Sequence, residues 1–218
     1  MIIAFGDSFT YGFNFNESER LNNVYPTLLG KKLNQPVLNT ALPGASNWRI
    51  ARMIQSMNIT KDDIVIISWT EPTRFELGVN KRHYVPPIKE NRIGDLNETD
   101  GDLITKRFFI QLTDRTTDKD AKKINELVYS EFNNEKWFQE MFKVMYNSCI
   151  QVLEKSGCKW LMFNAWIKQA DGEYHRNYVY SNTTMSGIIQ KNTPGYWTKQ
   201  EHEKVSNVLI NCLDELYA

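Results

Sequence analysis

The first apolar run of the chain ends in a serine turn. Met1–Phe5 has the pattern of a buried strand, and Gly6, Asp7 and Ser8 follow it without a break. A strand that stops at a serine between small residues can present the hydroxyl at the carboxyl edge of a sheet, where open α/β sheets bind their ligands. Ser8 is therefore our first candidate for chemistry. The alternative is that Asp7 and Ser8 only cap the next segment, as these residue types often do.

Two further loops are expected at the same edge of the sheet. Residues 39–47 follow a second predicted strand, Val37–Asn39, and residues 69–74 follow a third, Asp63–Trp69. The carboxyl ends of parallel strands share one edge of a sheet, so the three loops are expected to meet there.

Short β-branched runs alternate with amphipathic helical segments along the whole chain. A fourth strand is predicted at Lys159–Trp166. The predicted helices are Val24–Leu33, Asn47–Met57, a long one from Phe138 to Leu153 that stops before Gly157, and a final one that opens with the capping-box residues Thr198 and Glu201. This alternation predicts an α/β fold with a mostly parallel sheet between two helical layers.

One connection is too long to be an ordinary loop. Residues 75–132 separate the third strand from the long helix, and compact domains rarely contain such a connection without structure of its own. We expect a strand or hairpin in Leu103–Leu112 and a helix in Lys119–Phe132. We interpret the segment as a cap inserted into a single domain of residues 1–218. The alternatives are a surface excursion and a partner-binding surface.

Composition excludes several classes of function. Lys+Arg and Asp+Glu both number 26 in 218 residues, so the chain lacks the basic excess expected of a protein built around nucleic-acid binding. No apolar run is long enough to span a membrane, and no leader pattern precedes the first strand. The three cysteines have no metal-site spacing, so we expect free thiols, no metal, no cofactor and a cytoplasmic location.

The sequence resembles the SGNH (GDSL-type) hydrolases along its whole length. The family's GDS motif corresponds to Gly6-Asp7-Ser8, and its glycine after the second strand corresponds to Gly44. The resemblance implies a flavodoxin-like three-layer α/β/α fold, Ser8 as the nucleophile and the Gly44 N–H as an oxyanion donor. The Trp-Thr-x-x-x-Arg stretch from Trp69 also resembles SGNH-like proteins of bacterial viruses, which implies the host cytoplasm.

The chain departs from the family pattern after the third strand. Glu71 stands where the family has an oxyanion-binding Asn, and a carboxylate cannot donate a hydrogen bond. Thr70 and Arg74 are the neighbouring residues that could supply a donor instead. Asp7 and Asn47, which lie in the matched loops, are further candidates for contacting the substrate or the oxyanion.

A second departure concerns the catalytic base. Thr193 and Tyr196 stand where the family's D-x-x-H motif has its Asp and His. The family's second histidine is present as His202, which we expect to be the base. His175 is an alternative, and His83 in the insertion is the third histidine of the chain.

Two functions from different classes follow. The first is a serine hydrolase that cleaves an ester, such as an acetyl or other acyl group on a carbohydrate or small molecule. The second is a catalytically inactive SGNH-like protein used for binding or assembly. A group of aromatic residues would suit sugar stacking or a protein interface in either case: Tyr174, Tyr178, Tyr180, Tyr196 and Trp197.

Overall fold

A four-stranded, all-parallel sheet forms the centre of the molecule. The computed structural model describes residues 1–79, 108–112, 123, 126–127, 135–166, 174–179, 183–191 and 195–218. The strand order is β2-β1-β3-β6, with bounds β2 Val37–Asn39, β1 Ile2–Phe5, β3 Ile64–Trp69 and β6 Lys159–Asn164. An isolated parallel bridge between Met162 and Tyr178 adds a further segment beside β6. The predicted parallel sheet is confirmed.

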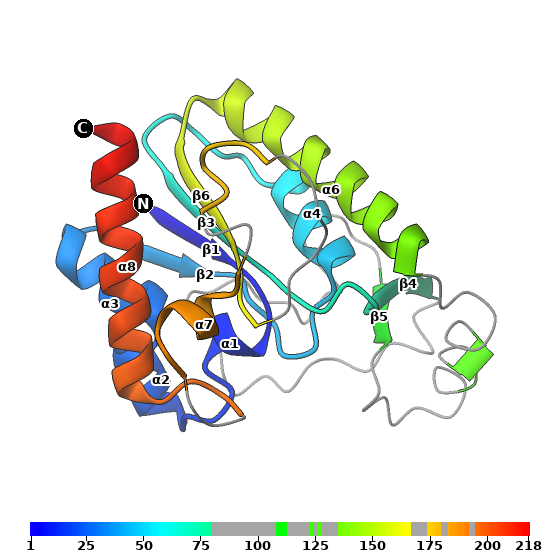
Figure 1. Cartoon of the computed structure of the whole chain (residues 1–218), viewed down its shortest axis with the longest axis horizontal. Helices are drawn as coiled ribbons and strands as arrows, with labels where there is room; N and C mark the ends of the chain where they lie inside the picture. The colour runs from blue at the N-terminus through cyan, green and yellow to red at the C-terminus, as the bar shows by residue number, and fades with distance from the viewer. Residues whose placement is uncertain are drawn as a thin grey trace.

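Helices cover both faces of this sheet (Figure 1). Helices α3 (Tyr25–Leu33) and α8 (Lys199–Tyr217) lie on one face, and α4 (Asn47–Ser56) and α6 (Glu135–Ser156) lie on the other. Side chains along β3 alternate between the two buried layers: Ile66 packs toward the first helix pair, and Val65 and Ile67 pack toward the second. A strand buried on both faces explains the continuous β-branched sequence of β3. The predicted three-layer α/β/α architecture is therefore confirmed.

Three short helices were not predicted. They are α1 (Ser8–Tyr11), α2 (Glu17–Asn23) and α7 (Met185–Ile188). The start of α2 was readable in the sequence, because Asn16 and Glu19 form a capping box in which each side chain accepts the other residue's backbone N–H. A four-residue helix such as α1 carries no periodic pattern, which is why α1 was missed.

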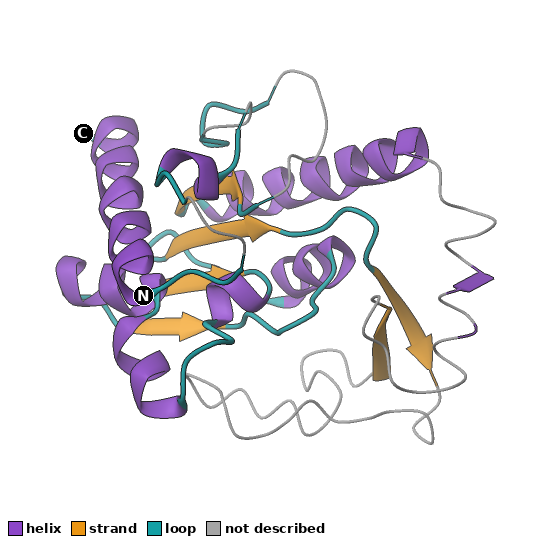
Figure 2. Ribbon diagram, turned by 60° about the horizontal axis from the view of Figure 1, so that its bottom comes forward, coloured by secondary structure: helices purple, strands orange, loops and turns teal. Residues whose placement is uncertain are grey.

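The described part of the insertion includes an antiparallel pair of strands. Strand β4 (Phe75–Val79) pairs with β5 (Phe108–Leu112), and the pair lies beyond the carboxyl ends of the central strands (Figure 2). The strand expected within Leu103–Leu112 is thus present from Phe108 onward. Most of the expected helix Lys119–Phe132 lies outside the described residues, although residues 123, 126 and 127 are helical. The cap function and the single-domain assignment stay predictions.

Cys149, Cys158 and Cys212 are buried free thiols. Within the described ranges, no group of side chains could hold a metal ion, and no helix has the length and apolarity needed to cross a membrane.

Candidate active site

Ser8 occupies the first position of α1, immediately after β1 ends. The Asp7 side chain caps this helix, because its Oδ1 accepts the Phe9 N–H at 3.0 Å. Gly12 ends the helix in a left-handed conformation (φ 79°), where glycine is favoured. The Ser8 hydroxyl forms no hydrogen bond with any described residue. The turn therefore both caps a helix and places a free hydroxyl at the carboxyl edge of the sheet.

A buried carboxylate fastens this turn to the loop after β3. The Asp7 side chain is fully buried, and its Oδ2 accepts the Thr70 hydroxyl at 2.5 Å and the Arg74 Nη1 at 2.9 Å. Arg74 Nη1 also lies 2.6 Å from Thr70 Oγ1 and 3.4 Å from the Ala45 carbonyl oxygen. Hydrogen bonds between ionised partners are short and strong, so the three predicted loops are held together here.

Asn47 makes a second connection between two of these loops. Its Oδ1 accepts the Thr70 N–H at 2.9 Å, and its Nδ2 donates to the Thr70 carbonyl at 3.3 Å. Asn47 is the first residue of α4 and is buried. The amide oxygen and the amide nitrogen both bind the Thr70 peptide, so Asn47 fastens the start of α4 to the loop after β3. A contact between Asn47 and a substrate stays a prediction.

Gly44 lies in a tight turn after β2. Its φ of 79° is left-handed, and the turn is closed by a hydrogen bond from the Ala45 N–H to the Leu42 carbonyl at 3.0 Å. A residue with a side chain would be strained in this conformation. The Gly44 N–H donates to no backbone carbonyl of the described residues. It therefore remains available as a donor.

Two candidates from the loop after β3 lack a free donor. The Thr70 hydroxyl hydrogen is used in the bond to Asp7, so the expectation that Thr70 supplies an oxyanion donor is wrong for this arrangement. The Glu71 Oε1 accepts the Thr73 hydroxyl at 3.2 Å, and an ionised carboxylate offers acceptors only. Arg74 is the remaining candidate in this loop.

His202 is held as a buried neutral imidazole. Its Nδ1 accepts the Tyr25 N–H at 3.2 Å, and its Nε2 has no hydrogen-bond partner. The rings of Phe15, Tyr25 and Trp197 surround it. Burial lowers the pKa of His202 to about 3, far below the value that suits a general base at neutral pH. Neither ring nitrogen is bonded to Ser8, and the pKa is too low for a base at neutral pH. We therefore do not assign the role of general base to His202.

His175 lies at the wrong end of the sheet. Its ring stacks on Trp160, near the amino end of β6, with the ring centroids 4.8 Å apart. Its Nδ1 accepts the Asn177 N–H at 3.2 Å, and its Nε2 lies 3.6 Å from Glu154 Oε1. Ser8 follows the carboxyl end of β1, so the expectation of His175 as an alternative base is wrong. His83 lies outside the described residues.

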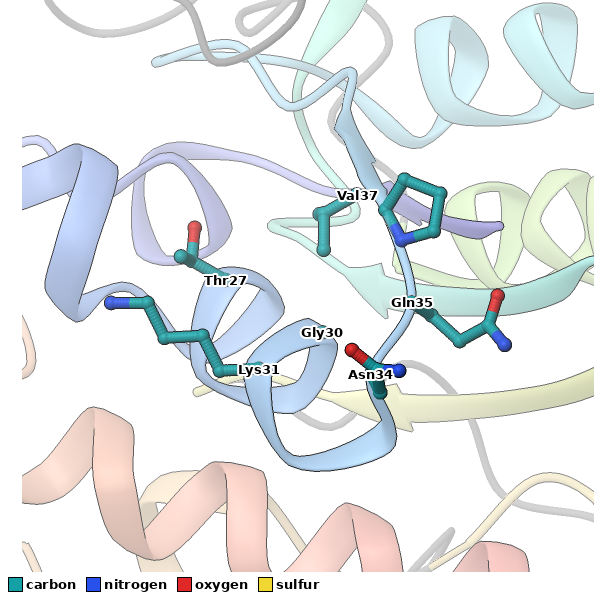
Figure 3. A pocket seen from close by; sticks show the side chains of 7 residues that line it. Thr27, Gly30, Lys31, Asn34, Gln35 and Val37 are labelled. Carbon is teal, nitrogen blue, oxygen red and sulfur yellow. The ribbon is translucent and has the colours of Figure 1, made fainter.

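A surface pocket of about 490 Å³ is unrelated to this site (Figure 3). It lies between α3 and the start of β2 and is lined by Thr27, Gly30, Lys31, Asn34, Gln35, Pro36 and Val37. Val37 is at the amino end of its strand, whereas Ser8 follows the carboxyl end of the neighbouring strand. The pocket is therefore at the opposite end of the sheet from Ser8.

Comparison with known proteins identifies the fold. No family profile and no curated sequence matches the chain. Among solved structures, TesA superposes with a TM-score of 0.50 at 11% identity, covering 99% of this chain and 98% of TesA. The chain has the fold of the SGNH (GDSL-type) hydrolases.

Two other solved structures are less similar. A protein assigned to the lipolytic G-D-S-L family from Desulfitobacterium hafniense DCB-2 has a TM-score of 0.38 at 14% identity, with 97% of this chain and 98% of that chain covered. Phospholipase A1 from Streptomyces albidoflavus NA297 has a TM-score of 0.35 at 10% identity, with 98% of this chain and 73% of that chain covered. The resemblance to proteins of bacterial viruses stays a prediction.

The loop before the last helix packs against α1, the helix that begins at Ser8. The Tyr196 ring lies 5.5 Å from the Phe9 ring and 5.4 Å from the Phe13 ring, and the Trp197 ring lies 5.0 Å from Phe9. Tyr196, which the sequence resemblance matches to the family's base, thus lies beside the helix that carries the nucleophile candidate.

The aromatic residues noted in the sequence do not form one group. Tyr174 and Tyr178 pack against Tyr146 of α6, at ring distances of 5.3 and 5.5 Å, on the other face of the sheet from Tyr196 and Trp197. Tyr180 lies outside the described residues. A single aromatic surface is therefore not formed, because the two pairs flank opposite faces of the SGNH sheet.

Proposed function

We propose that this protein hydrolyses an ester, with Ser8 as the nucleophile. The proposal rests on the hydrogen bonding of three groups in an SGNH fold: the Ser8 hydroxyl, the Ser8 N–H and the Gly44 N–H. The Ser8 hydroxyl is unbonded, and among the described residues neither the Ser8 N–H nor the Gly44 N–H donates to a backbone carbonyl. The loops that carry Ser8 and Gly44 meet at this edge of the sheet, where the Leu42 N–H donates to the Gly6 carbonyl at 3.3 Å. Acyl transfer requires a nucleophilic hydroxyl together with N–H donors for the oxyanion, and these three groups can supply both.

The reaction proceeds through an acyl-enzyme. The Ser8 Oγ forms a bond to the acyl carbon while its proton passes to a base, and the carbonyl oxygen becomes an oxyanion held by the N–H groups of Ser8 and Gly44. The C–O bond to the alcohol then breaks, and the alcohol leaves with the proton from the base. Water repeats the sequence on the acyl-enzyme and releases the acid and free Ser8.

The base is proposed by elimination. The chain has three histidines, of which His202 is buried against Tyr25 and His175 lies at the opposite end of the sheet. His83 is the one that remains, and it belongs to the insertion that leaves the sheet at the carboxyl side. We include His83 in the proposal as the proton acceptor from Ser8.

The proposed substrate is a small or carbohydrate ester. Phe13 and Trp166 are exposed, and both belong to the aromatic group around α1, where Phe9 lies 5.9 Å from Trp166. Exposed aromatic rings suit stacking on a sugar or an apolar acyl group. Nucleic acid is not proposed as a substrate, because the formal net charge of the chain is zero.

An inactive binding protein is the second candidate. The observation in its favour is that no histidine in the described ranges contacts Ser8, while Tyr196 stands where the SGNH base is expected. In this case the same edge would bind a ligand without turnover.

A fluorophosphonate probe separates the two candidates. If Ser8 is activated, the probe labels the wild-type protein and the Ser18→Ala control, in which an exposed helix serine is removed, but not Ser8→Ala. His83→Ala should lose labelling and hydrolysis of p-nitrophenyl acetate, by up to about 10⁶-fold if it is the base. Equal labelling of wild type and Ser8→Ala, or none in either, would decide for the binding protein. If His83→Ala is as active as wild type, the base assignment is wrong.

A further inference from the structure

We propose that Arg74 is the third oxyanion donor of this site and takes the place of the missing SGNH asparagine. The inference rests on the proposed function and names a catalytic residue for it. Its basis is the position of the guanidinium, which lies between the two loops that supply the backbone donors.

Arg74 Nη1 contacts a neighbour of each backbone donor. It lies 2.9 Å from the carboxylate of Asp7, the residue before Ser8, and 3.4 Å from the carbonyl of Ala45, the residue after Gly44. A single nitrogen that contacts both loops places the guanidinium between the segment that continues into Ser8 and the turn that contains Gly44. We infer that a negative charge held by the N–H groups of Ser8 and Gly44 develops within reach of this guanidinium.

The guanidinium has donors left for a substrate. It carries five N–H groups, and within the described residues its protein hydrogen bonds all use Nη1. The N–H groups on Nε and Nη2 remain. The side chain is 16% exposed, and its Cζ lies 5.9 Å from the centre of the Trp166 ring, which is also exposed. Arg74 is thus held on one side and accessible on another.

Asp7 is the positioning residue for Arg74. The carboxylate is fully buried, and it binds the guanidinium and the Thr70 hydroxyl through the same oxygen. Its other oxygen caps α1 at Phe9. One side chain therefore sets both the orientation of the helix that starts at Ser8 and the position of the cation. Preorganised donors of this kind stabilise a developing oxyanion without having to reorganise during the reaction.

The test compares substitutions that separate the charge from the packing. Arg74→Ala removes the guanidinium, Arg74→Lys keeps a charge without the planar fork, and Thr70→Val removes a hydroxyl from the network while leaving the guanidinium in place. Arg176→Ala, at an exposed arginine near the amino end of the sheet, is the matched control. Hydrolysis of p-nitrophenyl acetate and the urea midpoint of unfolding are measured for each variant, with and without added methylguanidine.

We expect Arg74→Ala to lower kcat by about 10²–10³-fold with little change in KM, as for the loss of one oxyanion donor. Methylguanidine should restore part of kcat without moving the unfolding midpoint, and Arg74→Lys should retain more activity than Arg74→Ala. If Arg74 had only a structural role, kcat would instead fall together with the unfolding midpoint in both Arg74→Ala and Thr70→Val.

The outcomes distinguish this inference from the proposed function. If Ser8 is labelled and the wild type turns over, but Arg74→Ala stays within threefold of wild-type kcat, the third-donor role is overturned and the esterase proposal stands. If kcat follows the unfolding midpoint across the variants, Arg74 only fastens the loops. If Ser8 is not labelled in the wild type, the proposed function fails, and the role of Arg74 fails with it.

Discussion

The buried His202 should make the protein less stable in mild acid. The unfolded chain binds a proton at this residue near its ordinary pKa of 6.5, whereas burial lowers the pKa in the folded state to about 3. As pH falls through 6.5 the unfolded state takes up a proton that the folded state refuses, so the free energy of unfolding decreases. From pH 7 to pH 5 one such group lowers the free energy of unfolding by about 2 kcal/mol.

The perturbation that tests this is His202→Asn. Asparagine keeps an acceptor for the Tyr25 N–H but does not titrate. The variant should be less stable than the wild type at pH 7, because the imidazole fills a site among the Phe15, Tyr25 and Trp197 rings. The contribution of His202 is identified by how the free energy of unfolding changes with pH. Between pH 7 and pH 5 the variant should lose about 2 kcal/mol less of this free energy than the wild type.

Urea unfolding followed by tryptophan fluorescence at half-unit pH steps measures this slope. Carboxylates titrate mainly below pH 5, so the window isolates histidines. His175→Asn is the matched control for the removal of a histidine, since His175 is partly exposed beside Glu154 rather than enclosed by aromatic rings. If wild type and His202→Asn lose the same free energy between pH 7 and pH 5, the buried neutral state of His202 is refuted.

Two further predictions concern the residues around the site and the core. Asn47→Ala leaves the buried N–H and C=O of Thr70 without their side-chain partner, so the free energy of unfolding in urea should fall by about 1–3 kcal/mol. Fluorophosphonate labelling of Ser8 should also become slower, and unchanged stability would contradict the role of Asn47 in holding the two loops together. Burial raises the pKa of the Cys149 thiol to about 12, so Ellman's reagent should leave Cys149 unmodified in the native protein and modify it after unfolding; fast native modification at Cys149 would contradict this.

Local patterns in the sequence predicted most of the framework. The β-branched run before Trp69 became β3, and the Thr198–Glu201 capping box opens α8 as expected. These signals work because strand burial and helix capping depend on residues only a few positions apart. The same is true of the turn at Ser8, since a strand end followed by a capping aspartate is visible in the sequence itself.

The roles of individual polar residues were less readable. Asn47 appeared as a substrate candidate, yet it binds the Thr70 peptide, and His202 matched a motif position, yet it is neutral and enclosed by rings. His83 and most of the insertion lie outside the described residues, so the cap and the base stay predictions.

The sequence by itself determined the alternation of the four central strands with the longer helices, the placement of Ser8 at a strand end and the glycine turn at Gly44. Each of these depends on local backbone preferences and hydrophobic periodicity. Tertiary structure alone decided that Asp7 binds Arg74, 67 residues away, and that His202 is buried. A hydrogen bond between distant segments and the desolvation that shifts a pKa both depend on which groups the folded chain brings together. No pattern in the local sequence records that arrangement.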